Sequence, residues 1–210
     1  MLIPLLDTVS PAVSTPTYEI VGPNYSENFH TYGLAWDPKS IRFFVDGEMV
    51  REVQDSEFLI STQSMYILLN LAVGGVWPGS PDASTQFPAS FDIDYVRAYE
   101  RKSIDVITED VLEDEYVLMF SDEFNGAALN EEVWNSAYLW GPYLRINNEE
   151  QVYIDKHGIH NDHPVNPFEV SGGTLKIKAD PIDENDLPDD PLKMTLFGLS
   201  TRCINAPRII

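Results

Sequence analysis

The sequence is poor in cysteine, in basic residues and in long apolar runs. Its 210 residues include a single cysteine, Cys203, so no internal disulfide can form. Basic residues number 13 against 34 acidic residues, which gives a formal charge of −21. A surface this acidic repels nucleic acid and anionic membranes, and suits a neutral ligand or a bound cation. No apolar run approaches the length of a membrane-spanning helix.

The first residues also lack the basic n-region and the apolar core of a secretory signal peptide. Residues 1–28 are rich in Pro and Ser, and we expect them to be loose. They contain one triplet, Asn24-Tyr25-Ser26, that fits an N-glycosylation acceptor, although such triplets are common by chance.

Beyond residue 28 the chain is a succession of short strand-like runs separated by turn signals. Residues 41–45 and 48–53 flank Asp46-Gly47, a strong hairpin signal. No long segment has the period of a helix, so the sequence predicts an all-β fold. The run 65–71 is apolar except for Asn70, which favours a strand buried on both faces. The other strand-like runs are 31–36, 91–99, 116–120, 150–154 and 174–179.

Two sets of motifs resemble parts of a glycoside hydrolase family 16 domain, of the laminarinase or endo-β-1,3-glucanase type. The first set resembles the C-terminal part of that domain and comprises residues 29–33, 44–47, 70–79 and 94–99. The second set resembles the N-terminal part and comprises residues 120–126, 147–153, 166–168, 172–177 and 198–202. The resemblance implies a jelly-roll, concanavalin-like β-sandwich, here incomplete or permuted.

The two parts stand in inverted order, which defines the predicted domains. These are a loose segment 1–28, a C-terminal part 29–100, an acidic linker 101–116 and an N-terminal part 117–210. Two arrangements explain the order: a junction between tandem domains, or a permuted and shortened sandwich. The tandem junction is favoured, because both outer ends break off around the same missing middle.

The missing middle holds the catalytic carboxylates of the family, which occur as Glu-x-Asp-x-x-Glu or Glu-x-Asp-x-Glu on one strand. Residues i, i+2 and i+4 of a strand share one face, and a nucleophile and an acid/base must flank the scissile bond about 5 Å apart. Neither pattern occurs in the sequence. The nearest acidic groups are residues 109–115, in the linker, and Asp92 with Asp94, in the C-terminal strand. We therefore predict no catalytic residue in this chain.

The resemblance nevertheless implies walls of a polysaccharide-binding cleft. Amides can donate to and accept from sugar hydroxyls, and aromatic rings can stack on sugar faces. The residues expected to bind substrate are Asn148, Gln151, Trp140, Tyr143, Asn70 and Trp77. Two alternatives stay open: Asn148 satisfies only a turn, or Asn70 is a buried strand residue bonded to backbone. Trp36 and Trp134 are expected in the core.

A structural Ca²⁺ is also implied by the resemblance, bound by the Asp94 carboxylate and by backbone oxygens of Glu123 and Gly173. Oxygen ligands of this kind suit Ca²⁺. The alternative is a half-built site, with Asp94 and Glu123 in different domains. His157, His160 and His163 have the spacing of metal ligands, but a polar surface loop is the better interpretation.

The expected function is that of a fragment of a family 16-type enzyme acting on β-glucan, itself without the catalytic carboxylates. The alternatives are a non-catalytic β-glucan-binding module and a non-functional gene remnant, whose unpaired strand edges would aggregate. The expected partner is a β-glucan-type polysaccharide, with no nucleic acid and no membrane. The family implies an extracellular or periplasmic location.

Overall fold

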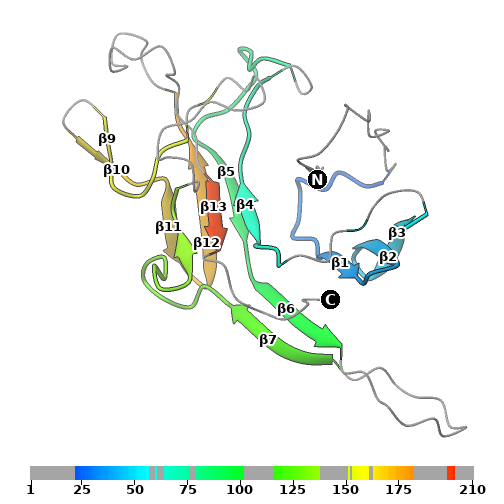
Figure 1. Ribbon diagram of the computed structural model, residues 1–210. Coiled ribbons are helices and arrows are strands. Elements are labelled where there is room, and N and C mark those ends of the chain that lie inside the picture. The colour runs from blue at the N-terminus through cyan, green and yellow to red at the C-terminus, as the bar shows by residue number, and fades with distance from the viewer. Residues whose placement is uncertain are drawn as a thin grey trace, which may run out of the picture.

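The computed structural model describes residues 22–56, 60, 64–75, 79–101, 116–137, 151, 153–160, 163–181 and 198–201. All regular structure in this part of the chain is β, so the predicted all-β fold is confirmed (Figure 1). In the same residues, no helix has the length and apolar character needed to cross a membrane. The strands are β1 (Tyr32–Trp36), β2 (Ser40–Val45), β3 (Glu48–Gln54), β4 (Leu68–Asn70), β5 (Ala89–Ile93), β6 (Val96–Arg101), β7 (Tyr116–Asp122), β8 (Trp134–Asn135), β9 (Gly158–His160), β10 (His163–Val165), β11 (Phe168–Ser171), β12 (Thr174–Ala179) and β13 (Gly198–Thr201).

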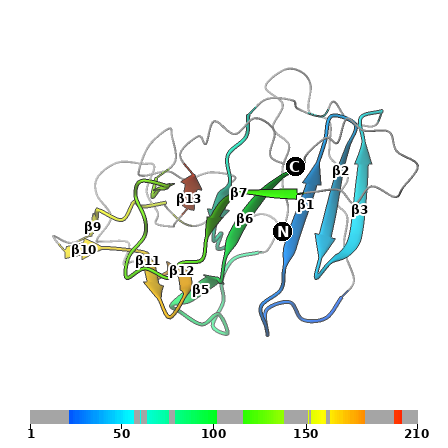
Figure 2. The ribbon, with the colours of Figure 1, turned by 90° about the horizontal axis from the view of Figure 1, so that it is seen from below.

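The first sheet is local and has the order β1-β2-β3. Its second hairpin turns at Asp46-Gly47, where both residues have positive φ, 50° and 84°. Positive φ at both central residues matches the right-handed twist of two paired strands, which explains why this dipeptide predicted the turn correctly. Figure 2 shows this sheet to one side of the remaining strands. The residue before β1 is connected to the rest of the chain by a hydrogen bond of 3.2 Å between Thr31 Oγ1 and the Tyr95 hydroxyl.

The remaining strands join the two parts of the sequence. Strand β5 pairs antiparallel with β12, and Ile93 lies opposite Leu175. Strand β6 pairs with β7 from Val96 opposite Asp122 to Arg101 opposite Tyr116, and β4 pairs with β13. Three of the five sheets formed by the described strands therefore contain strands from both sides of the acidic linker.

A hydrophobic core is shared by described strands from both parts of the sequence. Along β12 the side chains alternate between partly exposed and buried, and Leu175 and Ile177 are fully buried. They belong to the same buried cluster as Ile93 of β5 and Trp134 of β8. Partly buried side chains of β4 and its flanks pack on this cluster from the first part of the sequence: Ile67, Leu69, Leu71 and Val73. Residues of two sheets thus face a shared core, as in an incomplete β-sandwich. The expectation of a core position is confirmed for Trp134, whereas Trp36 is only partly buried.

Three strand predictions differ from the structure. The run 65–71 forms only the short strand β4, and Met65, Tyr66 and Leu68 are exposed, so burial on both faces was wrong. The run 91–99 is divided into β5 and β6, because the chain changes partner from β12 to β7 between them. In the run 150–154, the described residues contain an isolated bridge at Tyr153 rather than a strand.

Candidate functional site

Two of the amides predicted to bind polysaccharide lie around one tyrosine hydroxyl. Gln151 donates from Nε2 to the Tyr153 hydroxyl at 3.2 Å, and Asn70 donates from Nδ2 to the same oxygen at 3.4 Å. The backbone N–H of Val73 donates to Gln151 Oε1 at 2.8 Å. The structure therefore brings Asn70 and Gln151 together, although 81 positions separate them in the sequence.

Burial determines what this cluster can do. Gln151 is only 3% exposed, and its amide oxygen and nitrogen both bond within the protein. A buried amide that lost these partners would cost free energy, so the bonds stabilise the contact between the two parts of the chain. Asn70 is partly buried at the end of β4. Binding of sugar by either residue stays a prediction. Four further predicted binding residues lie outside the described residues: Trp77, Trp140, Tyr143 and Asn148.

A second polar cluster lies where β6 meets the end of β7. The Arg97 guanidinium donates two hydrogen bonds to the Glu123 carboxylate, from Nε at 2.7 Å and from Nη2 at 2.8 Å. These bonds, with the attraction between the two charges, lower the pKa of Glu123 and raise the pKa of Arg97. The guanidinium also lies 4.0 Å from the centre of the Tyr95 ring, within the range of a cation–π interaction. Glu123 is thus held as an ionised partner of Arg97.

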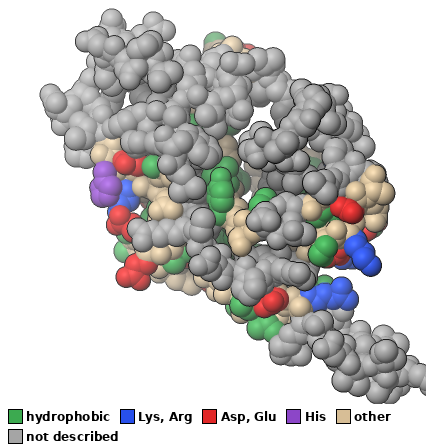
Figure 3. All heavy atoms as spheres, viewed as in Figure 1, with side chains coloured by type: hydrophobic (Ala, Val, Ile, Leu, Met, Phe, Trp, Pro, Cys, Tyr) green, Lys and Arg blue, Asp and Glu red, His purple; other side chains and the backbone are tan. Residues whose placement is uncertain are grey.

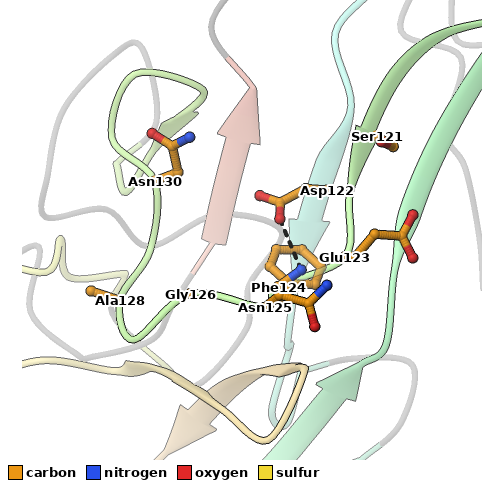
Figure 4. Close-up of a pocket in the computed structure, with 8 residues that line it drawn as sticks. All are labelled: Ser121, Asp122, Glu123, Phe124, Asn125, Gly126, Ala128 and Asn130. Carbon is orange, nitrogen blue, oxygen red and sulfur yellow. Dashed lines mark hydrogen bonds between the residues drawn. The ribbon is translucent and has the colours of Figure 1, made fainter.

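The turn after β7 is held by Asp122. Its Oδ1 accepts from the backbone N–H of Phe124 at 2.9 Å, and its Oδ2 accepts from the Trp134 indole at 2.7 Å. Phe124 adopts a φ of 46°, which is rare for a bulky side chain, and is buried against Trp134 with ring centres 6.0 Å apart. Figure 4 shows Asp122 and its bond to Phe124 at the edge of a pocket of about 350 Å³. The pocket is lined by Ser121, Asp122, Glu123, Phe124, Asn125, Gly126, Ala128 and Asn130.

Strand register brings segments that hold two of the residues expected to bind Ca²⁺, Asp94 and Gly173, next to each other. Ile93 pairs with Leu175, so Asp94 leaves β5 beside the turn at Gly172-Gly173. A Cβ placed on Gly173 would lie 3.5 Å from Asn125 Oδ1, so this turn also lies beside the segment after Glu123. Among the described residues, no three His, Cys, Asp or Glu side chains form a metal-binding group. That finding concerns side chains, whereas two of the three expected ligands are backbone oxygens.

The histidine-rich segment forms a small hairpin rather than a loop. Strands β9 and β10 pair, with His160 opposite His163. His157 is exposed, and its Nε2 lies 3.6 Å from a Glu131 carboxylate oxygen. Lys156 bonds to the same carboxylate, and its contacts lower the pKa of Glu131 more than those of His157 do. His157 therefore lies beside an ion pair on the surface.

Sequence reasoning missed three residues of these clusters: Tyr153, Arg97 and Asp122. Each lay inside a motif that was used only for its resemblance to a family. No local pattern indicates their partners, because Arg97 meets a carboxylate 26 positions away and Tyr153 meets an amide 83 positions away.

Comparison with known proteins relates the first part of the chain to one family. Residues 13–97 match the model of Glycosyl hydrolases family 16. Similar proteins include the Clotting factor G alpha subunit of Tachypleus tridentatus, 34% identical over 36% of this chain and 12% of its own length. Glucan endo-1,3-beta-glucosidase A1 of Niallia circulans is 29% identical over 39% of this chain and 14% of its own length. Beta-glucanase of Rhodothermus marinus is 31% identical over 37% of this chain and 30% of its own length.

The chain thus spans 12% to 30% of these three relatives. The match covers most of the part predicted at 29–100, while the resemblance of residues 118–202 stays a prediction. Residues 13–97 accordingly relate this chain to the glycosyl hydrolases of family 16 and to β-glucanases.

Proposed function

We propose that this chain is part of a glycoside hydrolase family 16-type protein that acts on β-glucan, and that these 210 residues alone do not hydrolyse it. The match of residues 13–97 to the family, with relatives named as glucanases, supports the substrate class. This match is the observation that carries the proposal. The family relation also favours an extracellular or periplasmic location.

The chemistry of the acidic residues supports the second half of the proposal. Retaining hydrolysis requires two carboxyl groups about 5 Å apart, one as nucleophile and one as acid and base. The sequence contains neither strand pattern that would supply them. The two acids beside the pocket are already engaged, Asp122 with Trp134 and Phe124 and Glu123 with Arg97. Their bonds fix the turn and leave no carboxylate pair for a glycosidic bond.

A non-catalytic β-glucan-binding module is the second candidate. One similar protein is named as a clotting factor subunit rather than as a glucanase, so similarity to these residues is not limited to proteins named for hydrolysis. The wall residues predicted for binding would then carry the whole function. Both candidates predict contact with polysaccharide and no hydrolysis by this chain.

The first prediction tests binding and hydrolysis together. In native gels that contain laminarin or lichenan we expect the purified chain to migrate more slowly than in plain gels. In agarose or carrageenan gels we expect no change. Reducing ends should not accumulate above a buffer control when the chain is incubated with either glucan, because the acid and the nucleophile are absent.

Trp36→Ala and Trp77→Ala form a matched pair for the binding assay, since Trp36 is a partly buried residue of β1 and Trp77 is expected in the cleft. Only Trp77→Ala should lose the retardation. No retardation of the unmodified chain in either glucan would contradict binding by this piece. Reducing ends that rise in proportion to the purified chain would contradict the absence of catalysis.

We also propose that the folded chain binds a structural Ca²⁺. Two observations fit it: Asp94 and the Gly172-Gly173 turn adjoin through paired strands, and that turn adjoins Asn125. The backbone oxygens of Glu123 and Gly173 would bind the ion together with the Asp94 carboxylate. Such an ion would connect strands from both parts of the chain.

The second prediction follows from the linkage between ligand binding and folding. A ligand at 100 times its Kd stabilises the folded state by about 2.7 kcal/mol, so saturating Ca²⁺ should raise the Tm by several degrees. Asp94→Asn should abolish most of this shift. Asp92→Asn, two positions earlier and within β5, is the matched control and should retain it. Equal shifts with Mg²⁺, or a full shift in Asp94→Asn, would contradict the site.

A further inference from the structure

The segment before β1 folds into a tight turn at Asn24-Tyr25-Ser26. Asn24 Oδ1 accepts hydrogen bonds from the Ser26 hydroxyl at 2.8 Å and from the Ser26 backbone N–H at 3.3 Å. Asn24 Nδ2 donates to the Glu27 carboxylate at 2.9 Å, and the Glu27 N–H donates to the Asn24 carbonyl at 3.2 Å. An Asx turn of this kind is built from local bonds and holds the asparagine amide in one orientation.

The middle residue anchors this turn to the protein. The Tyr25 ring makes an edge contact with His30, with ring centres 5.0 Å apart, and His30 Nδ1 donates to Asp46 at 2.7 Å. Gly22 lies so close beneath Tyr25 that an added Cβ would be 2.2 Å from the Tyr25 hydroxyl oxygen. Tyr25 is therefore held inward, while its neighbours Asn24 and Ser26 are exposed on the outside.

We propose that Asn24 is an N-glycosylation site. Asn24-Tyr25-Ser26 is the sole Asn-x-Ser/Thr triplet with a non-proline centre in the 210 residues. The structure adds what the triplet alone does not show: both polar residues are exposed, the Ser26 hydroxyl bonds to the Asn24 amide, and the Tyr25 ring keeps the turn in place. A glycan here would extend into solvent from the turn ahead of the first strand.

The donor would be an oligosaccharide linked through pyrophosphate to a lipid. Asn24 Nδ2 forms a bond to the anomeric carbon of the first sugar, and the bond from that carbon to the pyrophosphate oxygen breaks. The lipid pyrophosphate leaves with the bonding electrons, and one amide proton passes to a base of the transferase. No oxidation or reduction takes place.

The test is translation of the full 210-residue chain behind a cleavable signal sequence in endoplasmic-reticulum microsomes. We expect a single increase in mass that an N-glycan endoglycosidase removes. Asn24→Gln and Ser26→Ala should each lose it, and Ser26→Thr should keep it, because threonine retains the hydroxyl. Asn28→Gln, four positions away and outside the triplet, is the matched control and should be modified like the unmodified chain.

A further variant separates the turn from the triplet. Gly22→Val leaves the triplet intact but places side-chain atoms where the Tyr25 ring lies, so the modified fraction should fall. Absence of the mass increase in the unmodified chain, or its persistence in Asn24→Gln, overturns the proposal. Unchanged modification of Gly22→Val overturns the role of the anchored turn.

Discussion

Replacing Leu175 with alanine should lower the free energy of unfolding by about 2–5 kcal/mol, the range for a large aliphatic side chain removed from a packed core. Leu175 is 0% exposed and lies opposite Ile93, a buried residue from the other side of the linker. The cavity would therefore form where the two parts of the chain meet. Urea-induced unfolding, followed by tryptophan fluorescence, measures the change through the transition midpoint.

Leu118→Ala is the matched control, because it removes the same atoms from a leucine that is 50% exposed. In the space-filling view, hydrophobic side chains are visible at the lower edge of the molecule, where Figure 1 places the β6–β7 hairpin (Figure 3). Leu118 lies on this hairpin opposite Tyr99. Its loss should change the free energy of unfolding by no more than about 0.5 kcal/mol. Equal effects of the two substitutions would show that β12 does not pack into a shared core.

The positions of several strands could be predicted, because they depend on local patterns. The alternation of residues 174–179 predicted β12, and Asp46-Gly47 predicted the turn between β2 and β3. The run 65–71 was predicted less well, since apolar composition does not show how much of a strand is covered. Met65 and Leu68 are exposed despite that composition.

The partners of the strands could not be predicted. Period 2 determines which face a side chain occupies, but any strand with a complementary face can be its neighbour. The pairing of Ile93 with Leu175 joins positions 82 apart, and nothing near either residue indicates the other. The family resemblance assigned two parts of the chain to two halves of a domain, but it did not indicate whether these halves pack against each other.

The partners of the candidate site residues could not be predicted either, for the same reason. Asn70 and Gln151 were chosen as separate cleft amides, and the structure shows that both donate to Tyr153. Sugar binding by these amides stays a prediction, and their bonds within the protein depend on contacts between residues far apart in the sequence. The bidentate pair of Arg97 and Glu123 is a further case, since an exposed Arg and an exposed Glu are ordinary in any sequence.

These contacts bear on the choice between a tandem junction and a permuted sandwich. In the tandem arrangement, the two halves belong to different domains. Each of these domains would need a second half that this chain does not contain. In the structure, strands of the first half pair with strands of the second in three sheets, and both halves contribute to one buried cluster. We propose on this ground that the two halves form a single folding unit.

Cutting the chain within residues 102–115 should therefore leave two pieces that stay associated. We expect residues 1–108, carrying an affinity tag, to retain untagged residues 109–210 in equal amount when the two are co-expressed. The physical reason is that β6 and β7 remain paired from Arg101 opposite Tyr116 onward, and that the β5–β12 ladder buries Ile93 against Leu175. Loss of the covalent link removes only the entropic advantage of a short connection.

Ile93→Asp and Ser90→Asp on β5 test whether this association uses the observed ladder. Ile93→Asp introduces a carboxylate at a position that is 8% exposed, where an unpaired charge costs several kcal/mol, so the pieces should no longer co-purify. Ser90→Asp adds the same group at an exposed position opposite Lys178 and should leave the complex intact. If the unmodified pieces elute separately, each as a stable folded species, the two halves are independent domains and the tandem arrangement is correct. If they co-purify and only Ile93→Asp separates them, the shared core is what holds the chain together.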